Sequence, residues 1–170
     1  MIKLETERLA LRLLNDDDAP MIMSLLNEPS FIQNIGDKKV RDIEGALNYI
    51  HSGPLAMQNQ FGFSLYCCQL KTTGETIGIS GLIKRPEIEF PEVGFAFFQQ
   101  YCGQGFGFES ASVVMKYAHE KLNFQKLHAI CNSDNVASIA LLKKLAFRYL
   151  NDIVLPNNDN TIKLFEHNAE

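Results

Sequence analysis

The feature that most constrains this 170-residue chain is a glycine-rich turn between a predicted strand and a predicted helix. Residues 92–98 are rich in aromatic side chains and indicate a strand, and residues 102–107 then read Cys-Gly-Gln-Gly-Phe-Gly. Apolar residues follow at helical spacing, at Ala111, Val114 and Ala118. Glycines in such a turn allow close approach to the backbone, and the first N–H groups of the helix point at an anion. The pattern predicts a diphosphate site, although a flexible loop without a ligand has the same pattern.

Two other phosphate-binding patterns do not fit this turn. The nucleotide-hydrolase loop ends in Gly-Lys-Ser or Gly-Lys-Thr, and no such ending follows Gly107. The dinucleotide-binding pattern Gly-x-Gly-x-x-Gly needs its third glycine one position later than Gly107. The ligand class must therefore come from the rest of the chain.

Composition places the chain among globular proteins, with 46% hydrophobic and 21% charged residues. The net charge of −4 argues against a nucleic-acid partner, and no apolar run is long enough to span a membrane. The N-terminus lacks the apolar stretch of a secretory signal, so we expect a cytoplasmic protein. The four cysteines lack the spacing of metal sites or of a disulfide framework, so we expect no metal.

Hydrophobic periodicity predicts one α/β (α+β) domain over residues 1–170. The predicted order is β-α-α-β-β-β-α-β-α-β-β, in a mixed, mostly antiparallel sheet with helices on both faces. Pro20 suits the first turn of the first helix, where its missing N–H does no harm. The predicted strands are residues 3–14, 61–70, 75–84, 92–98, 126–131, 147–155 and 161–165.

Four segments together resemble the GNAT superfamily of N-acetyltransferases, and within it the ribosomal-protein N-terminal acetyltransferases. Residues 4–12 resemble the opening strand of that subgroup, Thr-Glu-Arg-Leu-x-Leu-Arg, and residues 92–95 resemble its fourth strand. Residues 102–109 resemble its coenzyme A loop. Residues 135–139 and 144–147 resemble its Asn-x-x-Ser-Ile and Lys-Leu-Gly-Phe segments. Each segment is weak alone, but their shared order along nearly the whole chain makes the resemblance specific.

The resemblance implies acetyl transfer from acetyl-CoA to a primary amine, on a protein N-terminus or a small molecule, by direct attack in a ternary complex. It implies that backbone N–H groups of the fourth strand face the thioester, that the loop grips the diphosphate, and that the next helix start contacts pantetheine. The implied cofactor-binding residues are Phe95, Ala96, Phe97, Gly103, Gln104, Gly105, Phe106, Gly107, Phe108, Asn135 and Ser138.

Two side chains are catalytic candidates. Glu92 is the candidate general base, acting through water, and its alternative role is a surface carboxylate or the partner of a basic residue. Ser138 is the candidate proton donor to the thiolate, and its alternative role is an ordinary polar residue of a first helical turn. Asn135, one turn earlier, has helix capping as its alternative role.

The chain departs from the family pattern at three positions. Cys102 replaces the usual Gln or Arg of the loop. Its position beside the start of a helix could lower the pKa of its thiol. Ala146 replaces a glycine after the last helix, and Leu142 replaces a tyrosine that many relatives use to protonate the thiolate. A non-catalytic acyl-CoA-binding module is therefore the alternative function. Monomer and homodimer are both open, and the acceptor amine has no readable motif.

Overall fold

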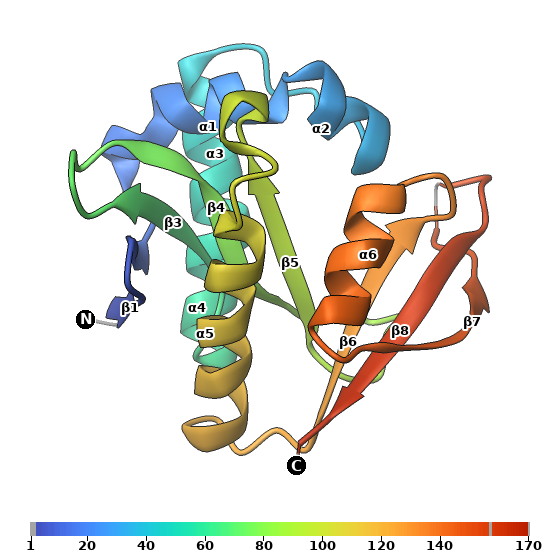
Figure 1. Cartoon of the computed structure of the whole chain (residues 1–170). Helices are drawn as coiled ribbons and strands as arrows, with labels where there is room; N and C mark the ends of the chain where they lie inside the picture. The colour runs from blue at the N-terminus through green and yellow to red at the C-terminus, as the bar shows by residue number, and fades with distance from the viewer. Residues whose placement is uncertain (1–2, 157, 170) are drawn as a thin grey trace.

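One eight-stranded sheet runs through the computed structural model, which describes residues 3–156 and 158–169 (Figure 1). The strand order is β1-β2-β3-β4-β5-β6-β8-β7. All neighbouring strands are antiparallel except β5 and β6, which are parallel. The strands are β1 (Lys3–Glu5), β2 (Leu9–Leu13), β3 (Leu65–Leu70), β4 (Thr76–Ile83), β5 (Glu92–Phe97), β6 (Lys126–Asn132), β7 (Arg148–Ile153) and β8 (Ile162–Asn168).

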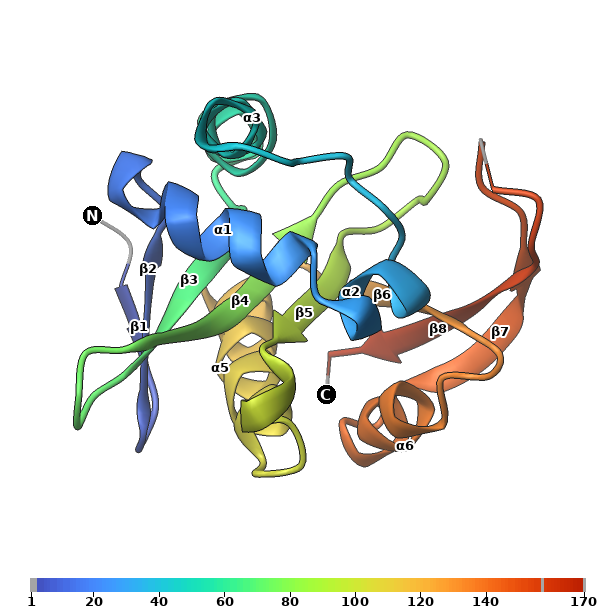
Figure 2. The same cartoon turned by 90° about the horizontal axis from the view of Figure 1, so that it is seen from above.

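Helices cover both faces of this sheet. Figure 2 shows α1, α2 and α3 on one side and α5 and α6 on the other. The α-helices are α1 (Ala19–Leu26), α2 (Pro29–Asn34), α3 (Ile43–Ile50), α4 (Ala56–Phe61), α5 (Phe106–Glu120) and α6 (Val136–Lys144). Three short segments complete the helical structure: the 3-10 helices η1 (Asp16–Asp18) and η3 (Gln99–Tyr101) and the π-helix η2 (His51–Leu55).

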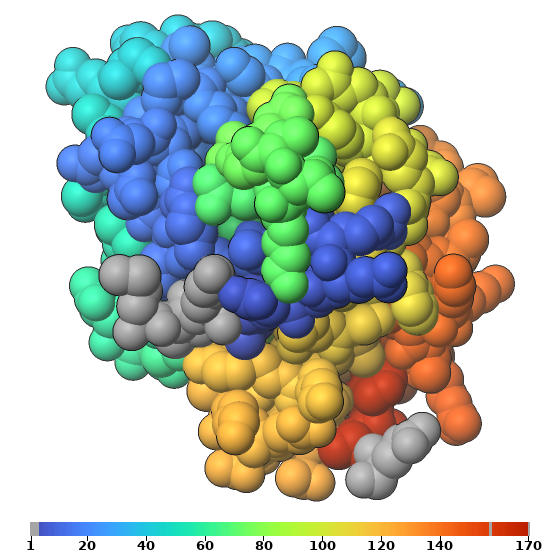
Figure 3. Space-filling model, turned by 60° about the vertical axis from the view of Figure 1, so that its left-hand side comes forward, coloured from blue at the N-terminus to red at the C-terminus, as the bar shows by residue number. Residues whose placement is uncertain are grey.

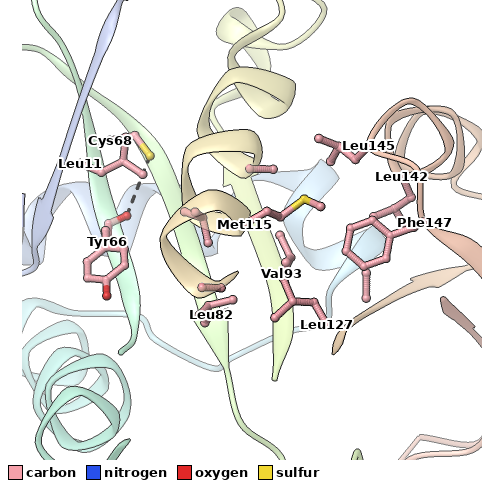
Figure 4. Close-up of a cluster of buried hydrophobic side chains, with 14 of the residues drawn as sticks. Leu11, Tyr66, Cys68, Leu82, Val93, Met115, Leu127, Leu142, Leu145 and Phe147 are labelled. Atoms are coloured by element: carbon pink, nitrogen blue, oxygen red, sulfur yellow. Dashed lines mark hydrogen bonds between the residues drawn. The ribbon is translucent and has the colours of Figure 1, made fainter. Parts of the chain in front are cut away.

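Each face of the sheet has its own hydrophobic cluster, because side chains alternate along a strand. In β5, Val93 belongs to the cluster under α5 and α6, whereas Ala96 packs against the cluster under α1 and α3. Figure 4 shows Met115 of α5 near Val93, with Leu142 and Phe147 beside them. The strand between these two cores is thus anchored on both faces.

The predicted fold class is confirmed, and two segments add detail that the periodicity missed. The predicted strand over residues 3–14 is two antiparallel strands, because Thr6 turns the chain: its N–H donates to the Leu9 carbonyl at 2.9 Å, and the Leu9 N–H donates to the Thr6 hydroxyl oxygen at 2.8 Å. The predicted strand at 61–70 begins only at Leu65, since Phe61 ends α4 and Gly62 follows with a left-handed φ of +79°. The short helices α2 and α4 were not predicted.

The sheet comes apart in its middle. Among the described residues, β5 and β6 share one register pair, Glu92 with His128, and the His128 N–H donates to the Pro91 carbonyl at 2.9 Å. Beyond that pair the two strands diverge, as Figure 1 shows, and we call this divergence the fork. The fork leaves one edge of β5 without a neighbouring strand, next to the start of α5.

Candidate functional site

The free edge of β5 carries backbone N–H groups that face the fork. The Phe98 N–H donates to the Ile77 carbonyl of β4 at 3.1 Å, so the strand alternation directs the Ala96 N–H toward β4 as well. The N–H groups of Phe95 and Phe97 then point the other way, toward the fork. Of the three residues predicted to supply donors, two therefore present an N–H group at the fork, and Ala96 does not.

The glycine-rich turn leads from η3 into α5 with the backbone geometry that glycine permits. Gly103 and Gly105 have φ of +73° and +86°, in the left-handed region. The first backbone bond of α5 runs from the Glu109 N–H to the Gly105 carbonyl at 3.0 Å, so the N–H groups of Phe106 and Gly107 precede it. In the described part of the chain no side chain caps these donors. The start of α5 therefore offers an anion site.

A clamp from the N-terminal turn holds this loop. The Arg8 Nε is 2.7 Å from Glu109 Oε2, its Nη1 donates to the Gln104 carbonyl at 3.0 Å, and its guanidinium lies 4.2 Å from the Phe106 ring centroid. The Thr6 hydroxyl and the Arg8 N–H both donate to Glu109 Oε1. Burial acts to raise the pKa of Glu109, but these bonds and the Arg8 charge hold it below its ordinary value. Figure 3 shows the blue N-terminal segment beside the yellow loop residues.

A small pocket lies between α5 and the end of α6. Its volume is about 260 Å³, and its lining includes Phe108, Met115 and Lys144. The Lys144 Nζ lies 4.5 Å from the Phe108 ring centroid. Nearer the loop the two helices touch, because a Cβ added to Gly107 would lie 3.0 Å from Leu141 Cδ2. The pocket therefore lies beside α5, farther along the helix than the anion site.

Glu92 lies at the vertex of the fork and is only 2% exposed. Its Oε2 is 2.7 Å from the Arg85 Nε. Burial raises the pKa of Glu92, and the charge and hydrogen bond of Arg85 oppose the rise. Glu92 is therefore a buried carboxylate paired with a cation, on the α1 and α3 side of the sheet, and not a surface group.

Asn135 and Ser138 begin α6 on the opposite side of the sheet. Asn135 Oδ1 accepts a hydrogen bond from the Ser138 N–H at 3.1 Å, so Asn135 caps the helix. The Ser138 side chain is hydrogen-bonded to the buried thiol of Cys131 in β6. Burial raises the pKa of that thiol, and the bond to Ser138 opposes the rise. The two catalytic candidates, Glu92 and Ser138, hence flank the fork from opposite faces.

The three departures from the family pattern have clear structural settings. The lowered thiol pKa considered for Cys102 is wrong, because burial and the Glu28 charge raise it. Leu142 is buried in the hydrophobic cluster and has no polar atom to replace a tyrosine hydroxyl. Ala146 has a φ of +63°, so the chain holds the left-handed geometry without the usual glycine.

Comparison with known proteins decides the family. Residues 8–148 match the sequence model of the acetyltransferase (GNAT) domain. The chain belongs to the GNAT acetyltransferase family. Members of this family transfer an acetyl group from acetyl-CoA, so the chain is an acetyltransferase, as the sequence resemblance predicted.

Individual GNAT proteins agree with this assignment. YoaA of Bacillus subtilis, named as an uncharacterized N-acetyltransferase, is 28% identical over 146 residues, which are 85% of this chain and 82% of YoaA. The crystal structure of an acetyltransferase from Agrobacterium tumefaciens C58 has a TM-score of 0.84 at 25% identity and covers 99% of this chain and 95% of its own. RimL, a ribosomal L7/L12 alpha-N-protein acetyltransferase in complex with coenzyme A, shares the fold with a TM-score of 0.84 at 16% identity and covers 98% of both chains.

Residues 3–156 and 158–169 contain no cluster of three or more histidine, cysteine, aspartate or glutamate side chains placed to hold a metal ion. None of the helices in this part is long and apolar enough to cross a membrane.

Sequence reasoning missed the residues that support the site from a distance. Arg8 and Thr6 were noted only as part of a strand that resembles the family pattern. Their distance from Glu109 in the sequence gave no indication that they contact it. The contact of Arg85 with Glu92 could have been predicted. A hairpin that pairs Ile83 with Glu92 brings the residues just after Ile83 near Glu92.

Proposed function

We propose that this GNAT protein acetylates a primary amine, on a protein N-terminus or a small molecule, by direct attack of the amine on acetyl-CoA in a ternary complex. The proposal rests on one observation: the site has two sets of backbone donors. The uncapped N–H groups at the start of α5 form one set, and the Phe95 and Phe97 N–H groups that face the fork form the other. The first set suits a diphosphate, and the second suits the carbonyl oxygens of pantetheine and thioester.

The residues around the fork supply the remaining chemistry. A preorganised N–H donor to the developing negative charge is worth about 2.7–4 kcal/mol of barrier, which Phe95 or Phe97 would contribute. Glu92, acting through water, takes the proton of the attacking ammonium, and its position on the α1 and α3 side leaves the α5 and α6 side to acetyl-CoA. Ser138 gives a proton to the departing thiolate, and Asn135 retains its side-chain N–H donors for the pantetheine arm.

Thiol release tests this function directly. Purified protein is incubated with acetyl-CoA and a panel of peptide N-termini, polyamines, amino acids and antibiotic amines, and free coenzyme A is measured. We expect release with at least one class. Failure to bind acetyl-CoA at millimolar concentration would discard the proposal, and binding without release, unchanged by Glu92→Gln and Ser138→Ala, would favour a non-catalytic acyl-CoA-binding module.

A pair of glycine variants assigns the loop in the same assay. Gly105→Val places a branched side chain at the anion site, 3.2 Å from Arg8 Nη2 at its Cβ, and should weaken acetyl-CoA binding sharply. Gly74→Val, in the turn between β3 and β4, meets the same left-handed strain with φ of +74° but has open space around it. Equal affinity in the two folded variants would show that the loop does not bind the diphosphate.

A further inference from the structure

A second pocket opens between the helical segment formed by η2 and α4 and the connection from β4 to β5 (residues 84–91). Its volume is about 400 Å³, which is within the usual range for small-molecule sites. Its lining includes Gly53, Ala56, Met57, Phe61, Lys84 and Arg85. Figure 2 shows the connection from β4 to β5, in light green, on the same side of the sheet as α3. The pocket is therefore separate from the coenzyme A loop and from the pocket beside α5.

The charge of this pocket comes from two cations. Its described lining contains Lys84 and Arg85 and no carboxylate. An ammonium group has three N–H donors, and Lys84 Nζ donates to three carbonyls of the connection, those of Arg85, Ile88 and Glu89. Lys84 is thus engaged in holding the connection in place, and Arg85 remains as the cation that a ligand can bind.

The Arg85 guanidinium has donors to spare. Its Nε donates to Glu92 Oε2 at 2.7 Å, and its Nη groups donate to no described residue. The side chain is 32% exposed, so a ligand can reach it from solvent. Two parallel N–H groups of a guanidinium match the two oxygens of a carboxylate. Arg85 can therefore bind a carboxylate in the pocket while it keeps its bond to Glu92.

Glu92 likewise has one oxygen left for a ligand. Oε2 accepts the bond from Arg85, whereas Oε1 accepts no hydrogen bond from any described residue. In the proposed reaction Glu92 takes the proton of the acceptor ammonium, and Oε1 is the oxygen that can do so, directly or through water. An ammonium at Glu92 and a carboxylate at Arg85 would lie at the two ends of one ion pair. Together the two side chains suit a molecule that carries both groups.

The helical wall of the pocket leaves room for the rest of that molecule. The segment η2 is a π-helix, a rare element that is frequent at functional sites. A Cβ added to Gly53 in this segment would meet no atom within 4 Å, so space is open beside it. Ala56 and Met57 of α4 add apolar surface to the same lining. The pocket thus combines one cationic group with an apolar wall.

We propose that this pocket binds the carboxylate of the acceptor, so that the amine acetylated by this protein also carries an acidic group and an apolar body. This inference rests on the proposed acetyl transfer at the fork. The carboxylate binds the Nη groups of Arg85, the apolar body lies against Ala56 and Met57, and the amine reaches Glu92 Oε1. A dipeptide with an apolar second residue has this combination of groups, whereas a polyamine lacks the acid.

Binding of a product analogue tests the pocket without catalysis. The probes are N-acetylglycyl-leucine and N-acetylglycyl-leucinamide, which differ only in the carboxylate, titrated into the 15N-labelled protein with NMR detection. We expect the acid to shift the amide signals of Gly53 and Met57 and the Nε–H signal of Arg85. Its Kd should be about tenfold lower than that of the amide, because the bonds to Arg85 are charge-assisted. Equal affinities, or shifts only at other residues, overturn the proposal.

Three variants assign the binding to this pocket. Gly53→Phe fills the open space without changing Arg85 or Glu92, and it should abolish binding of the acid. Arg85→Gln should make the affinities for the acid and the amide equal. The matched control is Arg41→Gln, an exposed arginine paired with Asp37, which should keep the wild-type ratio. If Arg85→Gln does not fold, Gly53→Phe and the wild-type ratio decide.

Kinetics connect the pocket to the acceptor and separate this inference from the proposed function. In the thiol-release assay, kcat/KM for glycyl-leucine should exceed that for glycyl-leucinamide about tenfold. Equal values for the two dipeptides, with the acid probe bound in the pocket, would assign the pocket to a regulatory ligand and overturn the proposal. A preference for amines without a carboxylate overturns it as well and leaves acetyl transfer standing. No thiol release with any amine removes the proposed function and the acceptor assignment with it.

Discussion

At the scale of single residues, Ala146 stores strain where α6 ends. Its N–H donates to the Lys143 carbonyl at 3.0 Å, and the Phe147 N–H donates to the Leu142 carbonyl at 2.9 Å. This pair of bonds is a Schellman motif, which requires a left-handed residue at Ala146 and normally uses glycine. A Cβ in that conformation costs about 1–2 kcal/mol. The two bonds and the contact of Phe147 with the core hold the geometry against that cost.

We predict that Ala146→Gly stabilises the protein. Relief of the strain, less the extra chain entropy of glycine, should leave about 0.5–1 kcal/mol and raise Tm by about 2 °C. The control is Ala140→Gly, in the interior of the same helix, which should lose about 1 kcal/mol. Thermal unfolding of both variants measures the difference, and a loss of stability in Ala146→Gly contradicts the strain.

The raised pKa of Glu92 predicts a pH signature of its role as base. Burial makes the carboxylate keep its proton above the ordinary value of 4.5, despite Arg85, so the base form is complete only at higher pH. Because ionised Glu92 takes the proton of the bound ammonium, kcat/KM below that pKa depends on the ionisation of Glu92 alone. Log kcat/KM should then rise with a slope of about one below that pKa and stay level above it, up to the pKa of the amine.

Glu92→Gln checks the assignment of that signature. The variant should lower kcat by about 10²–10⁴ and leave a slope of about one at all pH values below the amine pKa. Acetyl-CoA affinity should be unchanged, since Glu92 lies on the face of the sheet opposite the loop helix. A variant that keeps the change of slope would remove Glu92 as the base.

At the scale of elements, the clamp between the N-terminal turn and α5 should set the affinity of the loop. We predict that Arg8→Gln and Glu109→Gln each raise the Kd for acetyl-CoA about fivefold, because either change frees the loop at Gln104. Arg8 is substantially exposed, so its ion pair alone contributes little stability. The double variant should bind acetyl-CoA about as tightly as the weaker of the two single variants. If titration calorimetry shows that the two losses of binding free energy add, the two residues do not form a shared clamp.

The pocket between α5 and α6 suggests where the nucleotide end of acetyl-CoA lies. From Phe108 to Met115 the helix rises about 10 Å, roughly the length of a nucleoside. We predict that Lys144 contacts the 3′-phosphate, so coenzyme A should bind about tenfold more tightly than dephospho-coenzyme A. Lys144→Met should abolish this ratio, and Lys143→Met, next to it but outside the pocket lining, should preserve it. Equal affinities of the wild type for coenzyme A and dephospho-coenzyme A would contradict the assignment of Lys144 to the 3′-phosphate.

Much of this arrangement was predictable, and the reason differs between elements. Local spacing predicted α5 and its glycine turn, because helix periodicity and left-handed glycines are properties of a short segment. The family resemblance implied that N–H groups of β5 face the thioester, but the register pair at the vertex of the fork, Glu92 with His128, joins residues 36 positions apart. The clamp between Arg8 and Glu109 spans 101 positions, and no local pattern encodes such a contact. Distant polar contacts depend on the finished fold, and the sequence pattern does not show them.

At the scale of the whole molecule, the fork divides the sheet into β1–β5 and β6–β8. Besides the pair at its vertex, a polar contact crosses near the open end, where Asn132 Nδ2 at the end of β6 donates to the Asn34 carbonyl of α2 at 3.1 Å. Figure 2 places α2 above this end of β6. The two halves are thus joined at the vertex of the fork, by the hydrophobic cluster under α5 and α6, and by this contact near the open end. A ligand that bonds to β5, α5 and α6 would add a further connection between them.

Acetyl-CoA should therefore stabilise the molecule globally and protect the fork locally. At 100 times its Kd, a ligand that binds only the folded state adds about 2.7 kcal/mol, which raises Tm by about 5–10 °C for a chain of this size. Hydrogen exchange should slow at the Phe95 and Phe97 amides but not at Ala96, whose N–H already faces β4. Gly105→Val should lose both effects at the same ligand concentration. A rise in Tm without protection at Phe95 and Phe97 would mean that the ligand binds the loop yet leaves the fork open, and the oxyanion donors would then have to come from elsewhere.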